Sequence, residues 1–338
     1  MMNLTPSARP AAQHPQRGFS LIELMIALTI GMLIMAALVA LFINITRSNR
    51  ELAKVNSQIE NGRFALQVLE SDLVHAGYWG ELSPAAATAI PADPCLAGAS
   101  WNAAYKANML GIPVLGFSSA TIPGTCTKVS GPLAAGDILI VRHANTCVTG
   151  VGCEGDTLAD PDDGPHIQVS GCTTTPEAAY VIDSASAATF TLKKMNCSTI
   201  AERRKVVTNI YYLATSNGQP TLMRVSLVNG AYQTAQPLIE GIEALRFEYG
   251  IDSTGDGSPD GAYVSTPPTT LPDMGNIVAV KVHVLARSLE KSPGYADSKS
   301  YQLGSTSYTV PTADVGYKRH VFSSTIRLVN PSGRREVP

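Results

Sequence analysis

The sequence predicts an α+β protein in which one long N-terminal helix precedes an antiparallel sheet. Residues 19–78 contain no proline and combine an apolar first half with an amphipathic second half. Residues 205–330 contain segments in which apolar and polar side chains alternate, which is the pattern of strands with one buried face. We therefore expect the amphipathic half of the helix to pack on the sheet.

The apolar half of the helix, residues 19–45, is long enough to span a membrane. Twenty residues from Leu24 to Ile43 carry no charge, and about 20 apolar residues cross a hydrocarbon core about 30 Å thick. The run is longer than the apolar region of a secretory signal peptide, and no A-x-A-like site follows it. Arg9 and Arg17 precede it without any acid, so we expect residues 1–18 in the cytoplasm and the C-terminal domain in the periplasm.

One acid, Glu23, lies within the apolar run. An acid inside a spanning helix costs about 2.5–3.5 kcal/mol on insertion scales, so it normally has a partner and a function. A carboxylate that merely extends to the lipid headgroups is one interpretation. The other follows from the residues on either side of it.

The stretch Arg17-Gly18-Phe19-Ser20-Leu21-Ile22-Glu23 resembles the processing signature of type IV prepilins. Both have a basic leader that ends in glycine, then an apolar residue, with glutamate fifth in the mature chain. The resemblance implies that a prepilin peptidase removes the leader peptide 1–18 by cleavage between Gly18 and Phe19, and methylates the new amine of Phe19. In a filament, Glu23 would pair with the Phe19 amine of a neighbouring subunit and set the stacking register, because the opposite charge offsets the cost of desolvation.

Residues 46–80 continue the helix as an amphipathic segment. Its apolar positions recur at spacings of three and four, which places them on one helix face: Leu52, Val55, Ile59, Gly62, Leu66, Leu69, Leu73 and Ala76. Charged residues lie between them, Asp72 included, and are expected on a solvated or partner-facing side. We expect the apolar face to contact the C-terminal domain; a coiled-coil dimer is the alternative.

Residues 83–200 are rich in small residues and contain six cysteines: Cys95, Cys126, Cys147, Cys153, Cys172 and Cys197. An even number outside the cytoplasm favours disulfides, and no C-x-x-C spacing indicates a metal site. We predict the sequential pairs 95–126, 147–153 and 172–197, because each closes a local loop. Strand-like composition marks three segments of this loop-rich region: 136–144, 164–172 and 189–195.

The C-terminal region, residues 201–338, is expected to form an antiparallel sheet of four or five strands. The expected strands are residues 205–214, 220–228, 243–251, 276–288 and 319–330. Asn217-Gly218 predicts a hairpin turn between the first two. In the third, Leu245 and Phe247 alternate with Arg246 and Glu248, so one face is expected to be dry and the other wet.

Several blocks of sequence also resemble the PilW group of minor pilins within the type IV pilin-like superfamily. They are ENGRFALQVLESDLVHAGYWG, NIYYLA, EGIEALRFEYGID and YKRHVFSSTIRLVN. The resemblance implies the lollipop fold of that superfamily, and a low-abundance subunit that primes pilus assembly at or near the tip. Implied partners are other minor pilins, the major pilin, the prepilin peptidase and the inner-membrane assembly platform. Two alternatives stay open: a J-like pseudopilin of type II secretion, and a tip adhesin whose Cys-rich region binds a ligand.

One acidic loop could bind a metal. Asp252, Asp256 and Asp260 lie four residues apart in DSTGDGSPDG, which matches part of a calcium-binding loop but lacks the final glutamate. Three carboxylates with backbone carbonyls could hold Ca²⁺. The alternative is a turn that uses Asp, Gly and Pro for local hydrogen bonding.

The sequence does not favour catalysis or nucleic-acid binding. Its six histidines are scattered, and it contains neither H-E-x-x-H nor G-x-S-x-G. The formal net charge is −2 without a basic cluster, so the electrostatic footprint of a nucleic-acid-binding protein is absent. We expect no enzyme activity.

Overall fold

The computed structural model describes residues 18–91, 93–151, 164–174, 177–184 and 186–336. The chain divides into two compact units, Met1–Ala53 and Lys54–Pro338. Helix α1 (Leu21–His75) contributes to both.

Helix α1 has 55 residues, a length of about 80 Å at the usual rise per residue. It ends at a left-handed glycine, Gly77, with φ of +70°. A Cβ atom at Gly77 would also approach the rings of Pro113 and Pro331 to 3.2 Å, so both the conformation and the space favour glycine. The single long helix confirms the expectation from the sequence.

An eight-stranded antiparallel sheet forms the larger part of the unit Lys54–Pro338, with the order β1-β2-β5-β3-β4 and β6 pairing with β5, β7 and β8. Its strands are β1 (Val114–Ser118), β2 (Asp137–Ala144), β3 (Pro165–Val169), β4 (Tyr180–Ser184), β5 (Arg203–Ser216), β6 (Gln219–Val228), β7 (Ala231–Tyr232) and β8 (Gln236–Glu240). The turn between β5 and β6 has positive φ at Asn217 and Gly218, as a tight hairpin requires.

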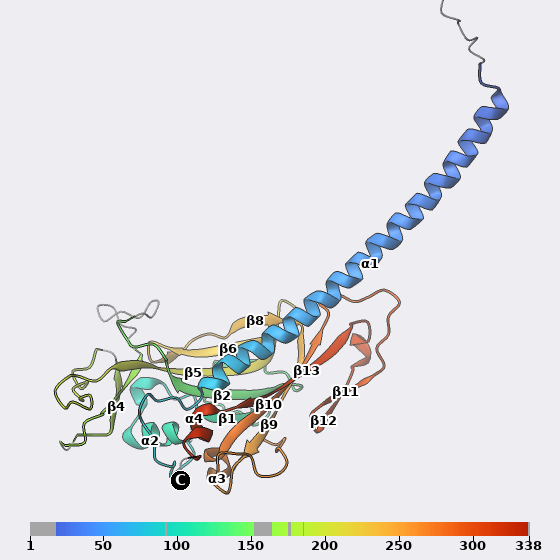
Figure 1. The fold of residues 1–338 in the computed structure, drawn as a ribbon. Coiled ribbons are helices and arrows are strands. Elements are labelled where there is room, and N and C mark those ends of the chain that lie inside the picture. Colours follow the sequence, from blue (N-terminus) through green and yellow to red (C-terminus); the bar gives the residue numbers. More distant parts are fainter. Residues whose placement is uncertain (1–17, 92, 152–163, 175–176, 185, 337–338) are drawn as a thin grey trace, which may run out of the picture. The chain divides into compact units, whose positions relative to one another are not determined.

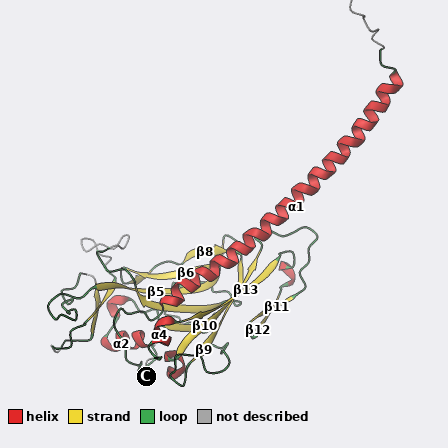
Figure 2. Cartoon of the chain, in the orientation of Figure 1, coloured by secondary structure: helices red, strands yellow, loops and turns green. Residues whose placement is uncertain are grey.

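A second sheet has three strands in the order β13-β10-β9. They are β9 (Ile242–Ile251), β10 (Ile277–Arg287) and β13 (Arg319–Arg327). A separate hairpin joins β11 (Ser300–Leu303) to β12 (Thr306–Thr309). Short helices complete the unit: α2 (Ala103–Gly111), α3 (Leu271–Gly275) and α4 (Val329–Gly333). Figures 1 and 2 show the second half of α1 beside β5 and β6.

The second half of α1 and both sheets share one hydrophobic core. Ala65, Leu69 and Leu73 of α1 lie in one buried cluster with Leu139 of β2 and Phe247 of β9. The neighbouring positions on β2 face a second cluster, which α2 and two buried tryptophans, Trp79 and Trp101, help to form. The larger sheet is therefore covered on both faces.

The expected division between residues 83–200 and 201–338 does not separate two sheets. Strand β2 pairs with β5 from Leu139↔Tyr211 to Ala144↔Val206, and β3 also pairs with β5. Strands of the Cys-rich region thus belong to the same sheet as the first two C-terminal strands. The expected single sheet of four or five strands is wrong, because long-range pairing leaves no local pattern in sequence.

Two further sequence predictions are corrected by the structure. Residues 189–195 do not form a strand, and an isolated bridge joins Lys193 to Ile200. The expected wet face of β9 is covered, because the β11–β12 turn lies over Glu248, which accepts a hydrogen bond from the Ser305 N–H at 2.8 Å. His283 Nε2 lies 3.3 Å from the other Glu248 oxygen, so these polar groups hold the hairpin in place.

Candidate functional site: an exposed apolar helix and its polar anchor

The expected processing site lies just before α1. Each residue from Gly18 to Ile45 is exposed in the single chain, and Phe19 is 91 % exposed. Residues 1–17 of the expected leader lie outside the described residues. Gly18 and Phe19 are therefore accessible to a processing enzyme in the isolated chain.

Glu23 has a local partner at the start of the helix. Its Oε2 accepts a hydrogen bond from the Ser20 N–H at 2.9 Å, while the Ser20 hydroxyl accepts from the Ile22 N–H at 3.4 Å. Ser20-x-x-Glu23 resembles a capping box, in which the glutamate binds back to the N-cap amide. Ser or Thr followed three residues later by Glu, just before an apolar run, is the sequence signature of this cap. Pairing of Glu23 with a neighbouring subunit stays a prediction.

The first half of α1 presents apolar side chains on all sides. Among the described residues, α1 is the one helix long and apolar enough to cross a membrane; its most apolar window has a mean hydropathy of 2.8 and is nowhere buried within the chain. A helix that is apolar all round is stable only when lipid or other helices cover it. This surface must therefore be covered by something outside the chain.

The second half of α1 is fixed by a buried polar network that begins at Asp72. Asp72 Oδ1 lies 2.9 Å from His143 Nε2 on β2, and Asp72 Oδ2 accepts a hydrogen bond from Asn209 Nδ2 on β5 at 3.0 Å. Asn209 in turn accepts from the Ser226 hydroxyl on β6 at 2.7 Å. The expectation that Asp72 lies on a solvated or partner-facing side is wrong, because β2 and β5 of the same chain supply it with partners.

The Asp72 carboxylate also controls the ionisation of His143. Burial disfavours the charged imidazolium, but the hydrogen bond and the negative charge of Asp72 outweigh burial and raise the pKa of His143. The pair stabilises the contact between α1 and β2 most when His143 is protonated.

Further polar contacts fix the helix along its length. Gln58 Nε2 donates to the Ala286 carbonyl at 2.9 Å, and Asn61 Nδ2 donates to the Glu240 carbonyl at 3.1 Å. At the C-terminal end, Asn330 Nδ2 lies within 3.3–3.5 Å of three terminal carbonyl groups of α1 and the residue after it. Leu52, which was expected on the packed face, is 58 % exposed, so the packed face starts later than the sequence indicated.

Two disulfides join cysteines of the loop-rich region, Cys95–Cys126 and Cys172–Cys197. Both correspond to pairs expected from the sequence. Cys153 lies outside the described residues, so the expected pair of Cys147 with Cys153 stays a prediction.

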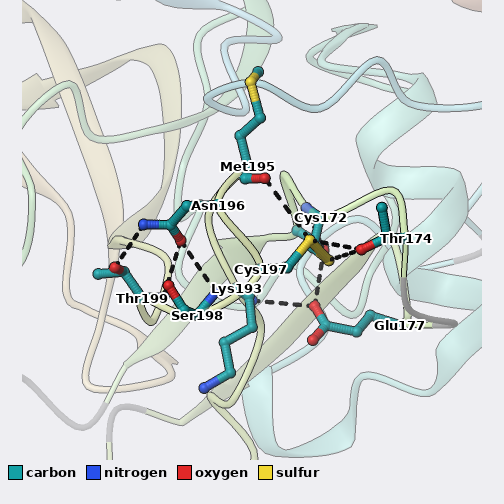
Figure 3. Close-up of a disulfide and its surroundings, with 10 residues drawn as sticks. Cys172, Thr174, Glu177, Lys193, Met195, Asn196, Cys197, Ser198 and Thr199 are labelled. Atoms are coloured by element: carbon teal, nitrogen blue, oxygen red, sulfur yellow. Dashed lines mark hydrogen bonds between the residues drawn. A yellow bond between two sulfur atoms is a disulfide. The ribbon is translucent and has the colours of Figure 1, made fainter.

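The Cys172–Cys197 disulfide closes a loop with an exposed apolar tip. Thr174 Oγ1 lies 3.1 Å from Cys197 Sγ, and Glu177 accepts from the Lys193 N–H at 3.1 Å (Figure 3). The side chain of Met195 points away from the disulfide and is 83 % exposed. The same methionine borders a cleft of about 420 Å³ whose lining includes Tyr78 and Trp79.

The acidic loop brings its three carboxylates together. Oxygen atoms of Asp252, Asp256 and Asp260 all lie within 4.8 Å of one another. Many of these oxygens already accept hydrogen bonds from the loop backbone. Asp252 accepts from the Gly255 and Gly257 N–H groups at 2.6 and 2.9 Å.

Asp252 also has a cationic partner. Arg335 Nη1 lies 3.4 Å from Asp252 Oδ2 and donates to the Asp252 carbonyl at 3.0 Å. Burial opposes ionisation of Asp252, but the backbone hydrogen bonds and Arg335 outweigh it and lower the pKa of the carboxyl group. The geometry is that of a turn organised by its own acids.

Comparisons with known proteins agree with the exposed apolar helix and the C-terminal strands. Residues 210–330 match the family described as type IV pilus-assembly protein W, and residues 13–39 match the prokaryotic N-terminal methylation motif. No curated protein sequence matches the chain.

A comparison with solved structures matched a type IV-like pilin from Thermus thermophilus. It has 13 % identity and a TM-score of 0.37, and the match covers 80 % of this chain and 97 % of that one. The two family matches stand without this distant likeness: residues 210–330 are similar to the PilW family and residues 13–39 carry the methylation motif, and together they support a PilW-like type IV minor pilin.

Proposed function

We propose that this minor pilin helps to prime the assembly of a type IV pilus and lies at or near the pilus tip, after cleavage between Gly18 and Phe19. The supporting observation is the first half of α1, whose apolar surface is exposed all round in the single chain. Before assembly, lipid of the inner membrane covers this surface, with the globular unit in the periplasm. After extraction, the helices of other minor pilins and of the major pilin cover it.

Glu23 acts in the assembled filament, the second of these two states. In lipid, the bond from the Ser20 N–H partly satisfies its carboxylate. In the filament, the methylated amine of Phe19 on a neighbouring subunit supplies the opposite charge, which a carboxylate removed from water requires. Because this pair forms in one relative position of two subunits, the inner-membrane assembly platform adds each subunit in the same register.

The replacement Glu23→Gln tests this register, with Thr29→Val as the matched control. Thr29 is the other polar side chain between Leu21 and Ile43, and its hydroxyl donates to the Ile26 carbonyl of its own helix at 2.9 Å. We expect both variants to reach the membrane at the wild-type level. Incorporation of Glu23→Gln into sheared pili should fall by about tenfold or more, the effect of losing about 1.4 kcal/mol. Equal recovery of both variants in pili would contradict the pairing.

A J-like pseudopilin of type II secretion is the competing assignment, and loss of the whole chain separates the two. A strain without the chain should lack surface pili, as seen by electron microscopy, and should secrete its type II substrates normally. Loss of secretion with intact pili would favour the pseudopilin.

A second candidate function is adhesion at the tip, favoured by the exposed Met195 beside its cleft. Strands β1 to β4 lie within the Cys-rich region, so removal of that whole region would disrupt the larger sheet. The replacement Met195→Asp is a milder test, with Val329→Asp as a control at another exposed apolar side chain. An adhesin predicts normal pili and reduced surface attachment for Met195→Asp alone. Normal attachment would end this proposal.

For the acidic loop we propose a structural role that does not need Ca²⁺, because Arg335 and backbone amides already occupy the Asp252 carboxylate. Titration calorimetry of the full chain in detergent tests this. We expect no heat of binding at millimolar Ca²⁺, the range of weak extracellular sites. A saturable signal that Asp260→Asn abolishes would establish the calcium site instead.

A further inference from the structure

A cleft of about 440 Å³ lies between the segment 83–87, which follows α1, and the end of the last helix, α4. Four prolines contribute to its walls, together with Ala85 to Ala87: Pro84, Pro113, Pro272 and Pro331. The volume is in the range of sites that bind small molecules or short peptide segments. All of its lining residues belong to the unit Lys54–Pro338.

The charge of this cleft comes from two consecutive arginines. Among the described residues that line it, Arg334 and Arg335 are charged and none is acidic. Asp273 is near in sequence, but its carboxylate accepts a 2.6 Å bond from the Thr270 hydroxyl at the start of α3. The lining is therefore apolar apart from a cationic end.

The two arginines differ in how they are satisfied. Arg335 contacts the Asp252 carboxylate, donates to the Gly275 carbonyl at 3.1 Å and also bonds to Asn276 Oδ1. Among the described residues the side chain of Arg334 makes one hydrogen bond, from Nη1 to the Gly77 carbonyl at 3.0 Å. Within the part of the chain that the structure describes, no carboxylate lies within ion-pair distance of Arg334.

Arg334 is thus a half-buried cation for which the described residues supply no counter-ion. Burial and the adjacent charge of Arg335 both lower the pKa of its guanidinium. A partly desolvated charge is costly unless an opposite charge pairs with it. A guanidinium has a planar fork of N–H donors that fits the two oxygens of a carboxylate, and one bond to a carbonyl leaves most of this fork available.

We propose that this cleft, the Arg334 cleft, binds a carboxylate carried by an extended, apolar peptide segment of a partner protein. Arg334 pairs with the carboxylate, and the proline and alanine walls contact the apolar part of the segment. The apolar walls favour a peptide over a bare oxyanion, which would fill little of the volume and would gain nothing from them.

The test uses the full chain in detergent micelles and the probe acetyl-Ala-Pro-Ala, either with its free carboxylate or as the carboxamide. Binding is followed by ligand-observed NMR. We expect the carboxylate form to bind at least about tenfold more tightly than the carboxamide, the effect of about 1.4 kcal/mol. Equal binding of both forms, or no binding of either, would overturn the proposal.

The variant Arg334→Gln tests whether the charge of Arg334 binds the carboxylate of the probe, because glutamine can still donate to the Gly77 carbonyl but carries no charge. Lys299→Gln removes the same charge from an exposed position and serves as the control. We expect the carboxylate preference to vanish in Arg334→Gln and to persist in Lys299→Gln. If Arg334→Gln melts early, Arg334→Lys retains the charge without the fork and should bind with intermediate affinity. Persistence of full affinity in the Arg334 variants would contradict the assignment.

Two further experiments identify the source of the carboxylate. Acetate that binds as tightly as the peptide would mean a site for free anions and would overturn the role of the apolar walls. Deletion of residues 337–338 should leave the affinity unchanged. If the deletion raises the affinity for the peptide by about tenfold or more, residues 337–338 of the chain itself occupy the cleft. That result would contradict binding of a partner protein.

Discussion

The two halves of helix α1 are continuous in backbone but opposite in surroundings. From Gly18 to Ile45 every residue is exposed in the single chain. From Gln58 onward, buried residues recur every three or four positions, and two of them, Gln58 and Asp72, are polar. The half with the more apolar sequence is therefore the half that the chain itself leaves uncovered.

This contrast shows that apolar content and burial within a chain are separate properties. Among the described residues the first half has no internal partner, so its apolar surface is available to lipid or to neighbouring helices. The second half uses fewer apolar residues and adds polar contacts of defined geometry, such as Asp72 with His143. Hydrophobic surface is non-directional, whereas hydrogen bonds fix one arrangement of helix and sheet. Substitutions in the two halves should therefore have different consequences.

The largest difference is expected between Leu69→Ala and Leu33→Ala. Leu69 is fully buried, and Leu33 is 71 % exposed. Leu69→Ala should lower the free energy of unfolding of the globular unit by about 3 kcal/mol, through lost burial and the remaining cavity. Leu33→Ala should change it by less than about 0.5 kcal/mol. Denaturant titration of the full chain in detergent, followed by the fluorescence of buried Trp79 and Trp101, measures both values. Equal effects would contradict the division of the helix.

A smaller effect is expected from Asp72→Ala, which removes the centre of the polar network. His143 and Asn209 would each keep a buried polar group without its partner, so the free energy of unfolding should fall by about 2 kcal/mol in total. Glu70→Ala alters an exposed acid on the same helix and should change the free energy of unfolding by less than about 0.5 kcal/mol. The same titration applies. If both variants unfold alike, Asp72 does not anchor the helix.

The smallest effect is a dependence on pH. The pKa of His143 is raised in the folded chain, so the folded state binds this proton more tightly than the unfolded state. The resulting stabilisation is complete below the unfolded pKa of about 6.5 and is lost as pH rises through the folded value. The melting temperature should therefore fall more between pH 6 and pH 9 in the wild type than in His143→Gln. Parallel melting profiles of the two proteins would contradict a role for this proton.

The sequence predicted the elements with strong local patterns and missed those that depend on distant residues. The length of α1, β2 and the β5–β6 hairpin follow from periodicity and from Asn217-Gly218. The burial of Asp72 could not be predicted, because its partners His143 and Asn209 lie far away in the chain. Short strands such as β8 and β11 carry too few residues for a clear alternation, and the pairing of β2 with β5 has no local signal.

Two parts of the candidate site, the apolar run and Glu23, could be predicted from the composition of residues 19–45. The bond of Glu23 to Ser20 has a local signal as well, the three-residue spacing of a capping box. No pattern in the sequence predicted the Arg334 cleft. Its walls come from segments that only the fold brings together, and a pair of arginines near a terminus is ordinary in sequence.

The central claim is that the first half of α1 is processed and then covered by other subunits. The most direct test is mass spectrometry of the mature chain isolated from pili. The account predicts an N-terminus at Phe19 that carries one methyl group. A chain from the same preparation that still begins at Met1, with residues 1–18 intact, would contradict it.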